Sequence, residues 1–106
     1  MIYKPTKMFS MNLTLFQESL SANQPPANLS VYLKTLWHDA KGEWNIAHQL
    51  IKDVEDKNAN WIHAYLHRKE GDELNAGYWY RRAGKTMYEG SLEDEWEEIV
   101  MELMMV

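Results

Sequence analysis

Apolar residues recur at intervals of three and four along almost the whole chain, which is the spacing of one face of an α-helix. No segment alternates apolar and polar residues between turn signals, so the sequence offers no candidate strand. Pro25 and Pro26 interrupt the pattern and predict a linker. Six helices are expected, with apolar faces over residues 9–20, 29–40, 44–54, 61–66, 74–83 and 92–104. Asn58 is the expected N-cap of the fourth helix. The predicted fold class is all-α.

The second and third helices form a unit that the fourth and fifth helices repeat 29 residues later. Gly42 and Gly71 occupy the same place in the two units, and Ala47 and Ala76 follow each glycine after the same gap. Glycine at a helix C-terminus readily adopts the positive φ that a tight turn requires, and a small residue lets two helices approach closely. The repeat predicts two stacked helical hairpins over residues 29–84.

The units KGEWNIAHQL and EGDELNAGYWYRRAG resemble the G-x-x-x-x-A core of tetratricopeptide-like repeats. They differ from those repeats in their period, which is 29 residues rather than about 34, and in lacking a closing proline. The length of 106 residues predicts one domain over residues 1–106. An N-terminal helix and linker (1–28) and an acidic amphipathic helix (91–106) would cap the two hairpins. The resemblance implies that the first helix of each hairpin lines a concave groove.

The strings LWHDAKGEWNIAH and WIHAYLHRKEGDELNAGYWYRRAG resemble a family of small, uncharacterised bacterial proteins. Members of this family share a tryptophan-rich helix, an AKG turn, an HAYLHR-x-EGD helix and a YWYRRAG helix. The resemblance implies a cytoplasmic bacterial protein. It implies no activity.

Four side chains are the candidate binding residues of the expected groove. His63 and His67 are one helical turn apart and lie away from the apolar face of their helix. The 29-residue shift gives Lys34 and His38 the equivalent positions in the first hairpin. Lys34, His38, His63 and His67 are therefore expected to line the groove and to bind an acidic peptide or a small anion. The alternative interpretation is a histidine-rich, solvated helix face.

The spacing of His63 and His67 also allows two imidazoles to hold one zinc ion. The residue after the first histidine is Ala64, whereas the hydrolytic zinc motif requires glutamate there. The chain contains no cysteine, so thiolate metal sites are excluded. We expect a surface or hydrogen-bonded histidine pair rather than a metal site, and no cofactor.

Charged residues elsewhere predict contacts between helices. Arg81 and Arg82 are candidates for an anion clamp; alternatively, their stems pack over Trp79 or pair with acidic residues of the last helix. The 29-residue shift also predicts two ion pairs between the hairpins. These are Asp39 with Arg68, and Lys41 with Glu70.

The last helix is acidic, since residues 86–106 contain seven carboxylates and no lysine or arginine. Ser91 and Asp94 resemble a capping box at its start. The acidic residues between positions 93 and 98 are expected to face solvent. Its apolar stripe is expected to dock on the helix over residues 74–83, with Glu95 or Glu98 near Arg81 or Arg82. A homodimer through this helix is the alternative.

Charge and hydropathy exclude some function classes. The net charge of −5 and the lack of a basic stripe argue against a nucleic-acid partner. No apolar run has the length of a membrane span, and no secretory signal is apparent, so neither membrane association nor export is expected. The preferred hypothesis is a cytoplasmic module that binds a protein, a peptide or a small acidic ligand. The alternatives are a small metal-dependent or acid–base enzyme using the histidines with Asp39, and a structural, oligomer-forming protein. No catalytic residue is assigned.

Overall fold

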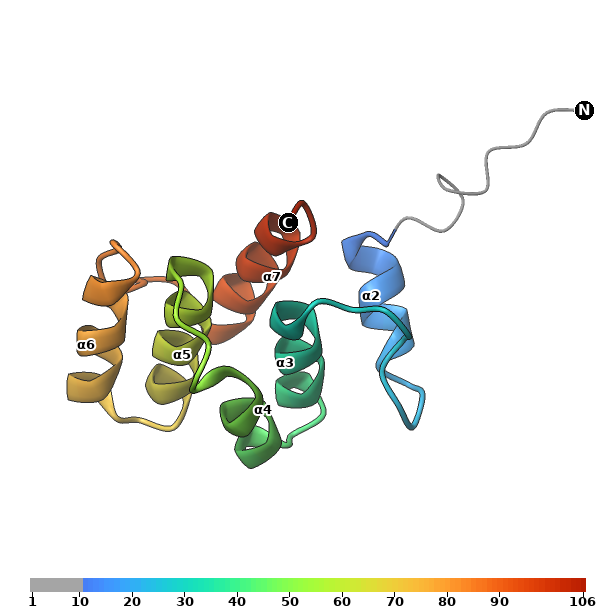
Figure 1. Ribbon diagram of the computed structural model, residues 1–106, viewed down its shortest axis with the longest axis horizontal. Coiled ribbons are helices and arrows are strands. Elements are labelled where there is room, and N and C mark those ends of the chain that lie inside the picture. Colours follow the sequence, from blue (N-terminus) through green and yellow to red (C-terminus); the bar gives the residue numbers. More distant parts are fainter. Residues whose placement is uncertain (1–10) are drawn as a thin grey trace, which may run out of the picture.

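The computed structural model describes residues 11–106, and in this range the protein is all-α, with no strand (Figure 1). Phe9, which belongs to the first predicted helix, lies outside the described residues. The helices are α2 (Leu13–Ser19), α3 (Val31–Ala40), α4 (Trp44–Ile51), α5 (Lys57–Lys69), α6 (Glu73–Arg82) and α7 (Leu92–Leu103). No helix within residues 11–106 has the length and apolar composition that a membrane crossing requires.

Short polar side chains begin most of these helices. Each of the N-caps accepts a hydrogen bond from the backbone N–H three residues later, which satisfies one donor of the first turn. This holds for Asn12, Ser30, Asp56, Asp72 and Ser91. The predicted cap at Asn58 is wrong by two residues, because the Asp56 carboxylate caps α5 through the N–H of Ala59 at 2.7 Å. At Ser91 the predicted cap is confirmed by its bond from the N–H of Asp94.

The two predicted glycine turns are confirmed. Gly42 has φ = +81° and Gly71 has φ = +89°, the left-handed conformation that favours glycine. After α3, the N–H of Glu43 donates to the carbonyl of His38 at 3.0 Å. After α5, the N–H of Asp72 donates to the carbonyl of His67 at 2.9 Å. The same terminal geometry therefore ends both helices and turns the chain sharply into the next one.

Two pairs of consecutive helices pack side by side, α3 with α4 and α5 with α6 (Figure 1). Helix α5 also contacts α3, α4 and α7, so it lies at the centre of the molecule. Every residue from 59 to 67 of this helix is buried. Helix α6 lies at one end of the row of helices and α2 at the other (Figure 1).

Helix α7 lies across α3 and α5 and also contacts α2, so its predicted docking on α6 is wrong. Its apolar stripe is buried within the chain, as expected, through Trp96, Ile99, Val100 and Leu103. The Trp96 ring packs against Phe16 of α2, and its N–H donates to the carbonyl of Leu36 at 3.1 Å. The homodimer hypothesis relied on this stripe, which the protein already uses for its own core.

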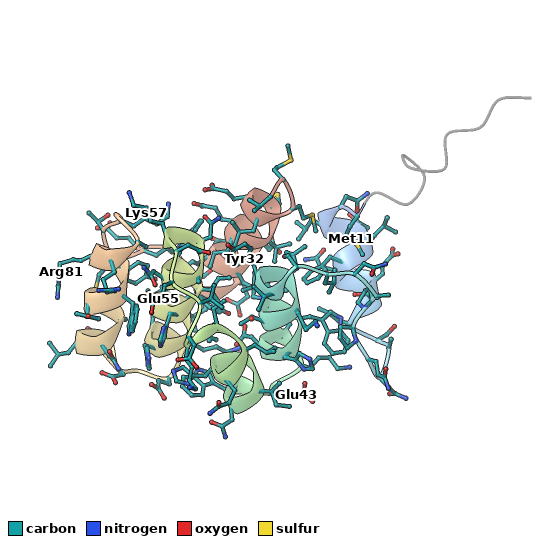
Figure 2. The ribbon with its side chains drawn as sticks, in the orientation of Figure 1. Met11, Tyr32, Glu43, Glu55, Lys57 and Arg81 are labelled. Atoms are coloured by element: carbon teal, nitrogen blue, oxygen red, sulfur yellow. The ribbon has the colours of Figure 1, made fainter. Side chains whose placement is uncertain are left out.

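The outer face of α6 is left uncovered by this arrangement. Leu74, expected on the apolar side of its helix, is 91% exposed. Arg81 and Arg82 are both exposed, and Arg81 extends from the outer edge of the molecule (Figure 2). Neither arginine forms an ion pair with Glu95 or Glu98. Arg68 of α5 binds Glu95 instead, and α6 reaches this carboxylate through the hydroxyl of Tyr80 at 2.6 Å.

Candidate metal centre

Three imidazoles meet between α4 and α5. His48 comes from α4, and His63 and His67 come from consecutive turns of α5. The ring centroid of His48 lies 4.9 Å from that of His63 and 5.3 Å from that of His67. The ring centroids of His63 and His67 are 4.9 Å apart. One nitrogen from each ring lies within 4.8 Å of the others. The three side chains therefore present a convergent set of nitrogen ligands.

Tryptophans hold this cluster from two sides. Trp44, one helical turn before His48, stacks on its ring at 4.9 Å, and the Trp44 N–H donates to the carbonyl of Leu66 at 2.8 Å. That bond fixes the start of α4 against α5. Trp79 of α6 stacks on His63 with a centroid distance of 3.9 Å and an interplanar angle of 17°. The rings are thereby held in defined orientations, with His63 and His67 buried and His48 half-buried.

Polar neighbours orient the third imidazole. The Glu70 carboxylate lies 2.7 Å from Nδ1 of His67, so this nitrogen carries the proton and donates it to the carboxylate. The lone pair of Nε2 is then available to a ligand. Asn75 reaches Nε2 only with a long contact of 3.5 Å. A carboxylate behind a histidine is the arrangement that fixes the tautomer of metal-bound imidazoles in proteins.

Burial favours the neutral form of two of these histidines. Desolvation, and after it the neighbouring His67 and His48, lower the pKa of His63 to about 4. The pKa of His48 is also lowered, mainly by burial and then by His67. At neutral pH both side chains are therefore uncharged. Their Nε2 atoms share one proton in a hydrogen bond of 3.1 Å, which an ion bound to both nitrogens would displace.

The depressed pKa of His63 predicts that acid destabilises the protein. Because the unfolded chain binds a proton near pH 6.5 and the folded chain only near pH 4, stability is present above the unfolded pKa and is lost as the pH falls between these values. The His63 contribution to this loss is up to about 2 kcal/mol between about pH 7 and pH 5. Urea unfolding of the wild-type and His63→Gln proteins at both pH values measures it. We expect the variant to lose less stability on acidification; equal losses would contradict the prediction.

The fourth histidine stands apart from this cluster. His38 lies 2.7 Å from the Glu43 carboxylate and packs edge-on against Trp37. Lys34 is half-buried on the same helix, α3. His63 and His67 are only 5% and 6% exposed, because α4 and α6 cover the face on which they lie. The expected groove of four open side chains is corrected accordingly, and His48 joins the α5 pair instead.

Arg82 of α6 follows the alternative interpretation, in which its side chain packs over Trp79, and Arg81 does not. Arg82 lies over the rings of Trp79 and Tyr78, at 5.3 and 5.7 Å from their centroids. Arg81 points to solvent. The anion clamp of Arg81 and Arg82 stays a prediction.

Asp39 and Glu95 are both buried. The sequence predicted an ion pair of Asp39 with Arg68, and a place for Glu95 facing solvent or near the arginines of α6. Asp39 accepts hydrogen bonds from Lys69 and Tyr65, both at 2.9 Å, instead of pairing with Arg68. Burial and the neighbouring Asp39 raise the pKa of Tyr65, so the phenol keeps its proton and donates it. The enzyme hypothesis required Asp39 beside the histidines, but its partners lie on the other side of α5, towards α7.

The expected pair of Lys41 and Glu70 also does not form. Lys41 donates instead to the carbonyls of Leu20 and Ala22, at 2.6 and 3.0 Å, while Glu70 binds His67.

No family model, curated protein or solved structure matches this chain. The resemblances to tetratricopeptide-like repeats and to the bacterial family therefore stay predictions.

Proposed function

We propose that this protein binds a divalent transition-metal ion through His48, His63 and His67. The observation that carries the proposal is the convergence of three imidazoles, two of which have their Nε2 atoms 3.1 Å apart. Two nitrogens bound to one tetrahedral zinc ion at about 2.0–2.1 Å lie about 3.3–3.4 Å from each other. A small rotation of the rings would accommodate the ion.

The ligand type favours particular metals. Imidazole nitrogens suit zinc, copper and nickel, whereas magnesium and calcium require oxygen ligands. Three protein ligands leave at least one coordination position for water or another small molecule, as catalytic zinc sites do. No acid or base is assigned beside the cluster, so the proposed function is metal binding and not a reaction.

Calorimetric titration of chelator-treated protein with zinc at about pH 7 tests this proposal. We expect one ion per chain in the wild type. The His63→Ala variant should bind at least about 100-fold more weakly, because loss of one of three ligands removes a full metal–nitrogen bond.

The chain supplies a matched control for this titration. His38→Ala also removes a histidine that packs against a tryptophan, but His38 lies on Glu43 and Trp37 instead of on another imidazole. This variant should bind zinc like the wild type. Equal affinity of the wild-type and His63→Ala proteins would refute the metal site, and so would a loss of affinity in His38→Ala as large as in His63→Ala.

A protein-interaction role is the second candidate, and one observation favours it. The outer face of α6 exposes Leu74 (91%) and Tyr78 (45%) beside Arg81 and Arg82. Uncovered apolar side chains next to basic ones suit an acidic, partly apolar protein or peptide. The partner hypothesis drawn from the sequence fits this face better than it fits the buried histidines.

A further inference from the structure

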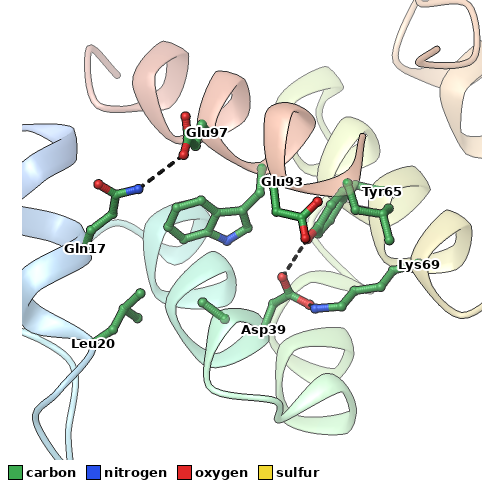
Figure 3. A pocket seen from close by; sticks show the side chains of 10 residues that line it. Gln17, Leu20, Asp39, Tyr65, Lys69, Glu93 and Glu97 are labelled. Carbon is green, nitrogen blue, oxygen red and sulfur yellow. Dashed lines mark hydrogen bonds and ion pairs between the residues drawn. The ribbon is translucent and has the colours of Figure 1, made fainter. Parts of the chain in front are cut away.

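A cavity of about 290 Å³ opens between α2, α3, α5 and α7 (Figure 3). Its two lining residues on α5, Tyr65 and Lys69, lie on the opposite face of that helix from the histidine cluster. Its size is near the lower end of the roughly 300–1,000 Å³ that small-molecule sites occupy. Apolar walls come from Leu20 at the C-cap of α2, Leu92 of α7 and the indole of Trp96. The cavity thus has the size and walls for a small molecule with an apolar body.

The floor of the cavity is polar but internally satisfied. Asp39 lies there with 1% exposure and accepts from Lys69 on one oxygen and from Tyr65 on the other. The ammonium group of Lys69 is thereby neutralised by a carboxylate at 2.9 Å. This lysine is consequently a poor counter-ion for an incoming anion.

The mouth of the cavity is acidic. Glu93 and Glu97 are one turn apart on α7 and so lie on the same face of that helix. Gln17 of α2 donates to Glu97 at 3.3 Å across the opening (Figure 3). Within residues 11–106, neither glutamate forms an ion pair. Two carboxylates without a cationic partner therefore flank the mouth of a cavity whose walls are apolar.

We propose that this cavity binds a small organic ammonium ion, with its apolar body between Leu20, Leu92 and Trp96 and its charge between Glu93 and Glu97. The electron-rich face of an indole attracts cations, which adds to the attraction of the carboxylates. A carboxylate or phosphate ligand of the same size would instead meet three carboxylates and only one lysine, already paired. Charge therefore selects the ligand class, and the apolar walls select its body.

Three probes of similar shape and different charge test this site: 2-phenylethylammonium, 2-phenylethanol and 3-phenylpropionate. The protein is the full chain, treated with chelator so that no metal at the histidines can take up the amine. Titrations followed by NMR report the indole N–H of each tryptophan separately. We expect saturable shifts at Trp96 with the ammonium probe, and binding at least about tenfold weaker with the anion.

Charge variants on α7 complete the test. The double substitution Glu93→Gln and Glu97→Gln keeps the shape of exposed and half-exposed side chains but removes both charges, and it should weaken binding of the ammonium probe at least about tenfold. Glu102→Gln removes an exposed charge of the same helix outside the cavity lining and should leave binding unchanged. The proposal is overturned by equal binding of cation and anion, by unchanged affinity in the double variant, or by no saturable shift at Trp96.

Discussion

Removal of residues 91–106 is expected to abolish cooperative folding. This deletion takes away α7, which buries Trp96, Ile99, Val100 and Leu103 against α3 and α5. At ~25 cal/mol per Å² of apolar area, one tryptophan and three aliphatic side chains are worth several kcal/mol. Since a small domain has only about 5–15 kcal/mol of stability in total, the truncated chain should aggregate or show no thermal transition in circular dichroism.

A shorter deletion is the control for this experiment. Residues 105 and 106 follow the C-cap of α7, and Met105 and Val106 are 86% and 68% exposed. Their removal should change the melting temperature little. A protein without residues 91–106 that stays monomeric and melts at the wild-type temperature would show that α7 does not support the core.

The second large effect is expected at Glu95, which is fully buried on the inner face of α7. One of its oxygens accepts from Arg68 at 2.8 Å, and the other accepts from the Trp61 N–H at 3.1 Å and from the Tyr80 hydroxyl at 2.6 Å. Glu95→Ala would leave a guanidinium group and two buried donors without their partner. Loss of one member of a buried pair costs about 3–5 kcal/mol, which urea unfolding should report.

Glu102→Ala is the matched control, because this glutamate is exposed on the same helix. We expect less than about 0.5 kcal/mol of change there. A similar stability of the Glu95→Ala and Glu102→Ala proteins would mean that the buried carboxylate does not hold α7 in place.

The helices and their turns could be predicted from the sequence because local interactions determine them. The positive φ of Gly42 and Gly71 follows from the chemistry of a helix end, which involves only neighbouring residues. The position of α7 could not be predicted in this way. Glu95 stands in a run of acidic residues, a pattern that predicts a solvent-exposed side chain. Arg68, 27 residues earlier, binds it instead and holds α7 on α5.

The candidate site was predicted in part. The helical spacing of His63 and His67 was sufficient to put them on one face of a helix. His48 was missed as a ligand because its approach depends on the packing of α4 against α5. The stacking order of two hairpins could have indicated it, since the second helix of the first hairpin then neighbours the first helix of the second. The burial of the cluster depends on Trp44 and Trp79, whose stacking no sequence spacing reveals.

X-ray absorption spectroscopy of the zinc-loaded protein tests the proposed metal site most directly. The account predicts a first coordination sphere with three imidazole nitrogens at about 2.0 Å, unchanged in His38→Ala and reduced to two in His48→Ala. The His48→Ala variant tests whether the histidine of α4 is a ligand in addition to the two histidines of α5. A sphere with fewer than three imidazoles in the wild type, or one that His48→Ala leaves unchanged, would contradict the account.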